Sequence, residues 1–457
     1  MEAAEKERER AAADIGRLAQ KEIDKLAKKV HGPRYQTILP KKKGARAMRV
    51  VITTVVEIPD SQMNVNGVEK IITQGWRQFP TQAWNAVAHA LEQGAEADYG
   101  GALKRKGRER RWFWTTAGLV HLERQRYCHA AEPHSFLLFD GRVGLSARVS
   151  VTPAAQRLFA QCAARGPSFG QVCQQLAMFY SQAPAPGTLW KWTQAEGAYW
   201  QKLADTQTKA FFCDGELPGG NLPPKSFVAV EADSTMVHAW RKKGHSHELY
   251  LGVAYDGKCK AGRRRKLTGK MAVASAAGAA EFGRELFVSV QAQHNVCEAQ
   301  TVLYLSDGAP ALETIRDELF PMAKHQLDHA HVVRKTREAY GYEHSRSADK
   351  TLALIFGQKQ WRLERLLNLH QRCFPQQSGA LNELKHYVLD HWEWLFAARR
   401  LKQQGQKLPP HVSGSGVIER NVGVYIGQRM KHRGMGWTKR GASNILRVRL
   451  NTLLQAS

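Results

Sequence analysis

The hydrophobic pattern of the chain is clearest in residues 227–240, FVAVEADSTMVHAW, around which the other elements can be ordered. The alternating apolar β-formers that open this stretch predict a buried strand. Asp256-Gly257 favours a tight hairpin further on. The same region is predicted to contain strands at 247–255, 266–275 and 301–307, helices at 279–290 and 310–319, and a short segment at 324–331 followed by a helix.

The order of these elements is β-β-β-α-β-α-β-α. The first three strands are predicted to form an antiparallel meander, and the later strands alternate with helices. The predicted fold class is therefore α/β, with a mixed sheet in residues 226–341. The final helices that belong with this sheet are expected at 411–457.

The other regions are predicted to be mainly helical. Residues 149–205 contain three helical patterns joined by tight turns, which fits a helix-turn-helix-like DNA-binding domain or a plain helical connector. Residues 342–410 repeat leucine and tryptophan at helical spacing and would form an insertion in the core. Further upstream, we expect a charged helical arm with a basic linker (1–45) and an α+β region (46–148) that contains a strand at 48–58, a helix at 68–98 and a hairpin at 112–128.

Composition limits the partners and the compartment. The 457 residues include 67 Lys and Arg against 41 Asp and Glu, which gives a formal net charge of +26 and a pI near 9.9. This charge indicates a polyanionic partner, usually nucleic acid; the alternative is a soluble basic enzyme. The seven cysteines include no Cys-x-x-Cys pair, and no apolar run approaches about 18 residues. A soluble cytoplasmic protein without a membrane span or signal peptide is therefore expected.

Basic residues gather in three runs that are candidates for contacts with the DNA backbone. The first run precedes the aromatic residues Trp112, Phe113 and Trp114, and its alternative interpretation is a solvated flank of a β-core. Phosphate contacts of this kind contribute affinity rather than sequence preference. The candidates are Lys104, Arg105, Lys106, Arg263, Arg264, Arg265, Arg429, Lys431 and Arg433.

Three carboxylates are candidates for a metal site. Asp233 lies on the strand at 227–240 and shares one face with Glu231, because side chains two residues apart project to the same side. Asp307 ends the strand at 301–307, where open α/β sheets place their ligands. Glu419 lies early in a helix that runs to about Met430. We expect Asp233, Asp307 and Glu419 to bind two Mg²⁺ or Mn²⁺ ions, since hard oxygen ligands favour these metals.

Each acid also has a purely structural interpretation. Asp233 could pair with an arginine, Asp307 could cap its helix, and Glu419 could favour a helix start through the macrodipole. Glu231 is then an accessory group beside Asp233.

Several local motifs resemble those of a known family, the ISLre-type transposases of bacterial insertion sequences. They are EADSTMVH at 231–238, SDGA at 306–309, QLDHAH at 326–331, GSGVIE at 414–419 and RGMGWTKRG at 433–441. With WTTAGLVHLERQRY at 114–127, the resemblance covers about residues 110–455.

This resemblance implies a DDE transposase with an RNase H-like core, in which Asp233, Asp307 and Glu419 form the acidic triad. Asp328 and His331 match a motif that related transposases place near the active site, which implies a supporting role. The implied partners are double-stranded DNA at transposon ends and at the target, bound by a homodimer or higher oligomer in the bacterial nucleoid. The rival functions are a domesticated, non-catalytic DNA-binding regulator and a metal-dependent nuclease that does not join strands.

Overall fold

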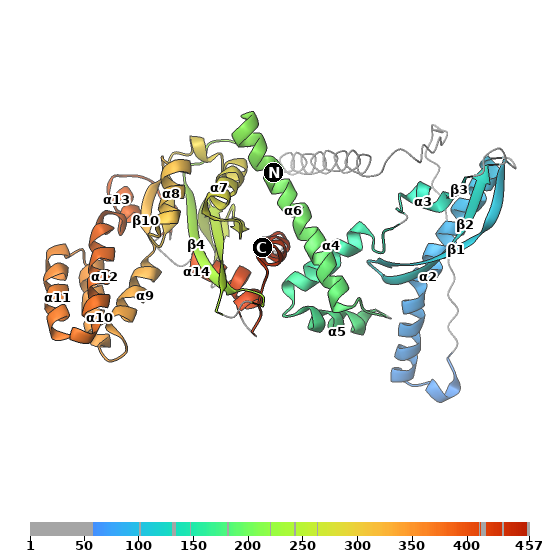
Figure 1. The fold of residues 1–457 in the computed structure, drawn as a ribbon, viewed down its shortest axis with the longest axis horizontal. Coiled ribbons are helices and arrows are strands. Elements are labelled where there is room, and N and C mark those ends of the chain that lie inside the picture. Colours follow the sequence, from blue (N-terminus) through green and yellow to red (C-terminus); the bar gives the residue numbers. More distant parts are fainter. Residues whose placement is uncertain are drawn as a thin grey trace. The chain divides into compact units, whose positions relative to one another are not determined.

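The computed structural model describes residues 58–99, 102–129, 134–146, 148–180, 182–219, 221–241, 244–262, 264–410, 412, 417–431 and 434–454. The predicted arm at 1–45 and strand at 48–58 lie outside the described residues, except for Ile58. The chain divides into two compact units, one comprising 1–113 with 120–150 and the other 114–119 with 151–457. Figure 1 labels their helices and strands.

The N-terminal region contains the long helix and the hairpin that the sequence predicts. Helix α2 (Val65–Asp98) begins at Asn64, whose side chain accepts a hydrogen bond from the Gly67 N–H at 2.9 Å. The sheet order is β1-β2-β3, and a small core that includes Phe113 and Phe139 lies between helix and sheet. The remaining elements are η1 (Asp60–Gln62), β1 (Leu103–Thr115), β2 (Gly118–His129), β3 (Ser135–Leu137) and α3 (Leu138–Val143).

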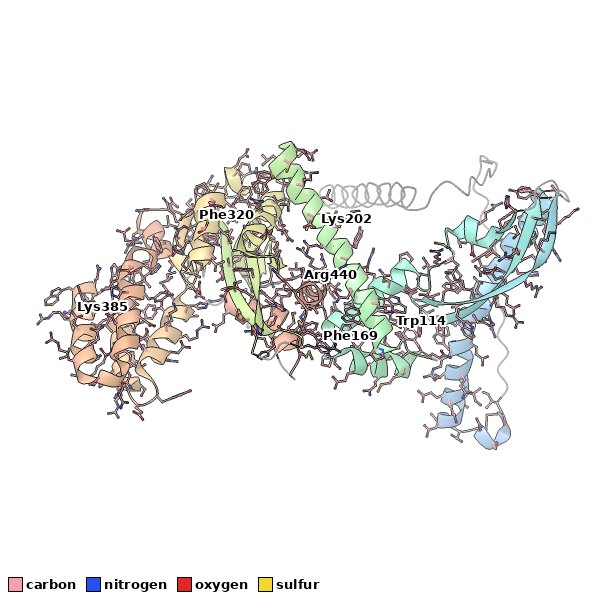
Figure 2. All side chains as sticks on the ribbon, viewed as in Figure 1. Trp114, Phe169, Lys202, Phe320, Lys385 and Arg440 are labelled. Carbon is pink, nitrogen blue, oxygen red and sulfur yellow. The ribbon has the colours of Figure 1, made fainter. Side chains whose placement is uncertain are left out.

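Three helices follow, as the sequence predicts for residues 149–205: α4 (Pro153–Arg165), α5 (Phe169–Phe179) and α6 (Pro186–Asp214). Thr152 and Ser168 cap the first two through their side chains. The three helices share one hydrophobic core, and Trp114 and Phe169, labelled in Figure 2, pack against it. Helix α6 extends nine residues beyond the predicted end at 205 and packs along α15 (Lys439–Leu454).

A five-stranded mixed sheet forms the centre of the second unit, so the prediction of a mixed α/β sheet is confirmed. Its strand order is β10-β9-β4-β5-β8, with β5 antiparallel to β4 and to β8, and with β9 parallel to both β4 and β10. The strands are β4 (Val228–His238), β5 (Ser246–Tyr255), β8 (Met271–Ser275), β9 (Val302–Ser306) and β10 (Lys324–Leu327).

The predictions of a single strand at 266–275 and of a hairpin at Asp256-Gly257 are wrong. The chain instead leaves the sheet after β5, forms a separate hairpin of β6 (Gly257–Ala261) and β7 (Arg264–Thr268), and returns as β8. Gly269 separates the two strands, because its φ of +58° lies in the left-handed region that β-strands do not use. The Asp256 carboxylate is engaged by Lys225, whose Nζ lies 3.1 Å away.

Helices cover both faces of the sheet, and the side chains of β4 alternate between the two cores that these helices form. Val228, Val230 and Ala232 pack into one core with α7 (Ala279–His294) and α8 (Pro310–Leu319). Ala229 packs into the opposite core, formed with α15, α14 (Val417–Val422) and the π-helix η5 (Gly423–Lys431). Glu231 and Asp233 share the face of Ala229 and therefore point toward the C-terminal helices.

The segment predicted as a helical insertion is helical, and its core continues directly from β10 through Leu327 and Val332. The buried Gln326 fixes this junction: its amide donates to the Leu395 carbonyl at 2.7 Å and accepts from the Ala398 N–H at 3.1 Å. Among the described helices, none is long and apolar enough to cross a bilayer. The elements are α9 (His329–Tyr340), α10 (Ser345–Phe356), α11 (Gln360–Cys373), α12 (Ser378–Asp390), η4 (Trp392–Trp394) and α13 (Ala397–Gln403).

Candidate metal centre

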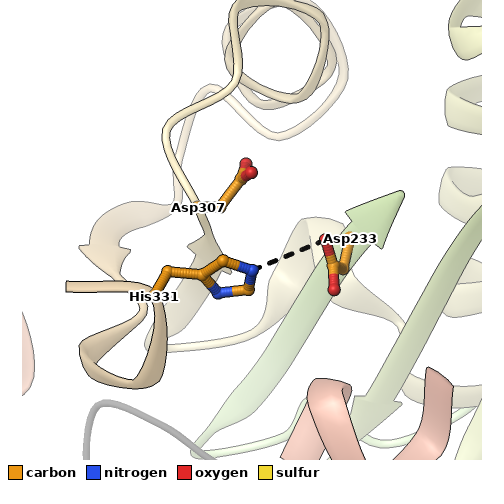
Figure 3. Close-up of side chains that lie close together, drawn as sticks. All are labelled: Asp233, Asp307 and His331. Carbon is orange, nitrogen blue, oxygen red and sulfur yellow. Dashed lines mark ion pairs between the residues drawn. The ribbon is translucent and has the colours of Figure 1, made fainter. Parts of the chain in front are cut away.

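Asp233, Asp307 and His331 converge at one edge of the five-stranded sheet (Figure 3). Strands β4 and β9 are parallel neighbours, with Glu231 opposite Leu305. Two positions further along, Asp233 on the continuing strand β4 therefore lies beside Asp307, which directly follows the end of β9. One ligand atom from each of the three side chains lies within 4.8 Å of the other two. Two carboxylates and one imidazole at this spacing can bind a divalent ion.

The turn after β9 fixes the position of Asp307. Gly308 adopts a φ of +81°, which glycine tolerates without the clash of a Cβ atom. One oxygen of the Asp307 carboxylate accepts a hydrogen bond from the Ala309 N–H at 2.9 Å, and Pro310 then begins α8. The half-buried carboxylate thus stands on a short, well-defined turn.

His331 is oriented by Asp328, three residues earlier in the first turn of α9. Its Nδ1 lies 2.9 Å from Asp328 Oδ2, while Asp328 Oδ1 accepts from the Ala330 N–H at 3.0 Å and caps the helix. This leaves His331 Nε2 facing the cluster, 3.9 Å from Asp233 Oδ1. Metal-binding histidines usually donate their other ring N–H to a carboxylate in this way.

Burial and mutual repulsion raise the free energy of the charged form of Asp233. Burial raises the pKa of its carboxyl, the charge of His331 lowers it, and that of Asp307 raises it again, with a net upward shift. Burial by itself would lower the pKa of His331, but its bond to Asp328 and the charge of Asp233 outweigh burial and raise it. A cation shared by these groups would relieve the cost of holding two carboxylates together.

Glu231 lies deeper in the same face of β4, with 1% of its surface exposed. Its carboxylate accepts a hydrogen bond from the Tyr255 hydroxyl at 2.7 Å and another from the Ile418 N–H at 2.8 Å. Burial raises the pKa of Glu231 to about 7, against the opposing effect of these two bonds. Glu231 therefore joins β4 to the start of α14.

Glu419 is the one predicted triad member that does not belong to the cluster. Its side chain is exposed in the first turn of α14, one residue after Ile418. The backbone of Glu419 is thus held near Glu231, while His331 contributes the third ligand atom of the group. The Asp-x-x-His spacing at the start of a helix was the sequence signal for His331.

The basic residues predicted to contact DNA have different surroundings. Lys104, Lys106 and Arg265 are exposed, whereas Arg105 pairs with Glu96 through two hydrogen bonds of 2.6 and 2.7 Å.

Arg429 is 2% exposed, with its guanidinium about 5 Å from the ring centres of Phe169 and Trp437, which places it in the core rather than on a DNA-binding surface. Lys431 is exposed and donates to the Thr235 hydroxyl. Arg263, Arg433 and the side chain of Arg264 lie outside the described residues.

Tyr387 and Lys335 were not predicted to lie near the site. The Tyr387 hydroxyl donates to the Asp307 backbone carbonyl at 2.8 Å, across 80 positions of sequence. Lys335 Nζ lies 3.7 Å from the centre of the Tyr387 ring. No local pattern in the sequence connects these two residues to Asp307.

Comparison with known proteins adds one relative. No protein-family model matches the chain. The chain is similar to the "UPF0236 protein in vanSb 3'region" of Streptococcus gallolyticus, with 24% identity over 335 residues that cover 72% of this chain and 69% of that protein. The name of that relative states no activity.

Proposed function

We propose that this protein is a metal-dependent DDE transposase with an RNase H-like core, which cleaves DNA at transposon ends and joins those ends to a target. The observation that carries the proposal is the convergence of Asp233, Asp307 and His331 to within 4.8 Å. The five-stranded mixed sheet and the net charge of +26 support it, because the first has the predicted element order and the second suits a DNA substrate. The quoted motifs resemble those of ISLre-type transposases.

The donor set fits Mg²⁺ or Mn²⁺. Asp233 and Asp307 supply hard carboxylate oxygens, and His331 supplies Nε2 with its ring held by Asp328. We keep Glu419 as the third acid of the triad, because its helix begins beside Glu231, on the face of β4 that also carries Asp233. Bound divalent ions would supply positive charge that stabilises the charge developing on the phosphodiester oxygens.

In this proposal the protein acts by positioning and by charge. Water cleaves the phosphodiester at the transposon end and leaves a 3′-hydroxyl, which then attacks a phosphodiester of the target DNA. No covalent protein–DNA intermediate is required, so no serine or tyrosine nucleophile is assigned. Exposed cations such as Lys104, Lys106 and Arg265 would hold backbone phosphates.

The test is cleavage of a supercoiled plasmid that carries the ends of the element, with Mg²⁺ and with EDTA. We expect Asp307→Asn to lower the rate about a hundredfold or more, because the metal supplies several kcal/mol and each 1.4 kcal/mol is a factor of ten. Asp349→Asn, the same change at an exposed position of α10, should leave the rate unchanged. Full activity of Asp307→Asn would overturn the proposal.

The same assay separates the rival functions. A nuclease would yield cut plasmid without strand-transfer products. A non-catalytic regulator would bind the DNA and leave it intact in Mg²⁺.

A further inference from the structure

The helical insertion reaches the metal cluster through Tyr387. This residue lies near the end of α12, and its hydroxyl donates to the backbone carbonyl of Asp307 at 2.8 Å. The bond acts on the backbone of the turn and leaves the Asp307 carboxylate free to face Asp233 and His331. Tyr387 therefore contacts the backbone of the turn and not the Asp307 carboxylate that would bind the metal.

A second residue of the insertion, His391, directly follows α12 and also packs against the Asp307 turn. His391 Nδ1 lies 2.7 Å from the Tyr387 carbonyl, and its Nε2 lies 3.2 Å from a carboxylate oxygen of Glu313 on α8. A Cβ atom at Gly308 would come within 3.2 Å of His391 Nε2, so the ring packs directly against the turn. The insertion thus contacts both the Asp307 turn and the helix that follows it.

Tyr387 also contacts the helix that carries His331. Lys335 lies one turn after His331 in α9, and its Nζ is 3.7 Å from the centre of the Tyr387 ring, in the geometry of a cation–π contact. One side chain of the insertion therefore touches both segments that contribute Asp307 and His331. These segments are also joined directly by the β9–β10 pairing, which ends with Ser306 opposite Leu327, and by a hydrogen bond of 2.8 Å from the Asp328 N–H to the Ser306 carbonyl. Neither connection includes Asp307 or His331 itself.

We propose that Tyr387 is a positioning residue for the metal centre, and that α12 of the insertion sets the separation of the Asp307 turn from His331. The inference rests on the proposed metal-dependent function. Its physical reason is that the half-buried Asp307 carbonyl would lose this hydrogen-bond donor without Tyr387, and the turn would shift to satisfy it. Residues that orient metal ligands in this way commonly change metal affinity 10- to 100-fold when replaced.

The experiment measures Mn²⁺ binding to the full-length chain by electron paramagnetic resonance, independently of cleavage. Tyr387→Phe removes only the hydroxyl and should weaken Mn²⁺ binding about tenfold, while the melting temperature without metal changes little. Tyr342→Phe, the same change at a fully exposed tyrosine between α9 and α10, should bind Mn²⁺ as the wild type does.

The outcomes separate this inference from the proposed function. Equal Mn²⁺ affinity of Tyr387→Phe and the wild type would overturn the inference and leave the metal site standing. A lower melting temperature with unchanged Mn²⁺ affinity would assign Tyr387 a merely structural role and would also overturn it. Absence of Mn²⁺ binding by the wild type would contradict the metal-dependent function itself, and the inference with it.

Discussion

At the scale of single residues, the cluster shows how one carboxylate can serve two donors. Asp328 accepts from the Ala330 N–H with one oxygen and contacts His331 Nδ1 with the other. The first bond begins the helix and the second orients the imidazole. The position of His331 is therefore determined by the same residue that starts α9.

Replacing Asp328 by asparagine should separate these roles. Asparagine is a good N-cap but has one acceptor oxygen where aspartate has two, so either the cap or the bond to His331 is lost. We expect Asp328→Asn to weaken Mn²⁺ binding about tenfold with a small loss of stability. Isothermal titration with Mn²⁺ measures the affinity, and Asp349→Asn is the control; unchanged affinity would show that Asp328 does not orient a ligand.

A buried histidine outside the cluster should make stability depend on pH. Burial, together with the charges of Arg316 and His391, lowers the pKa of His325 to about 3, and its Nε2 lies 2.9 Å from Ser306 Oγ. Below about pH 6.5, His325 binds a proton in the unfolded chain but stays neutral in the folded chain. The free energy of unfolding therefore falls as the pH falls from about 6.5 toward 3.

The expected slope from this group is about 1.4 kcal/mol per pH unit in that window, and it disappears above pH 6.5. Urea unfolding of the wild type and of His325→Gln at pH 5.5 and 7.5 measures it. The variant should lose less stability between these two values than the wild type. Equal losses would mean that His325 titrates normally in the folded protein.

At the scale of elements, a glycine permits the close approach of α6 and α15. A Cβ atom at Gly197 would lie 2.3 Å from the Asn444 carbonyl oxygen and 2.5 Å from its Cα, both backbone atoms that cannot rotate away. Gly197→Ala should therefore destabilise the protein by roughly 1–3 kcal/mol or more.

The control lies in the same helix. A Cβ atom at Gly187 would have no neighbour within 4 Å, so Gly187→Ala should cause no loss of stability. Thermal unfolding of both variants measures the difference. Equal melting temperatures would mean that the two helices can separate to admit a methyl group without cost.

Strand and helix identities in the core followed from the sequence because their signals are local. The apolar run of β4, the Asp-Gly-Ala-Pro turn before α8 and the helical spacing in residues 342–410 each depend on neighbours within a few positions. The strand at 266–275 was predicted as one element because its basic and apolar halves both favour β-structure. Only the left-handed conformation of Gly269 divides them.

The site was predictable only in part, for a related reason. Asp233 and Asp307 could be proposed for one site because Asp233 lies on an apolar strand and Asp307 ends a later strand, where open α/β sheets place their ligands. The exposure of Glu419 and the approach of Tyr387 to Asp307 depend on how helices distant in sequence pack, which no local pattern states. The burial of Arg429 between Phe169 and Trp437 is of the same kind.

At the scale of the whole molecule, the charge of +26 predicts DNA binding that depends strongly on salt. If about six to ten phosphates are contacted, affinity should fall by roughly 10³ to 10⁵ between 50 and 200 mM salt, because bound counterions are released on association. Fluorescence anisotropy with a labelled duplex measures this. A flat salt dependence would contradict the proposed role of the basic surfaces.

Variants can show which lysines contribute to the salt dependence of DNA affinity. Lys104→Gln with Lys106→Gln should reduce the slope of log affinity against log salt by about one for each phosphate that these lysines neutralise. Arg105 is a poor choice because its pairing with Glu96 mixes charge with structure. Lys70→Gln, on the exposed surface of α2, is the matched control and should leave the slope unchanged.

The tip of the β1–β2 hairpin, residues 114–119, belongs to the second unit, although both strands belong mainly to the first. Trp114 lies 5.8 and 6.0 Å from the ring centres of Phe159 and Trp192, and the Thr152 N–H donates to the Trp114 carbonyl at 2.8 Å. The polypeptide therefore crosses between units three times, and no single cut can release either one intact. A truncation beginning at residue 151 would remove Trp114 from its contacts with Phe159 and Trp192. Any attempt to produce the C-terminal portion alone must therefore retain the hairpin.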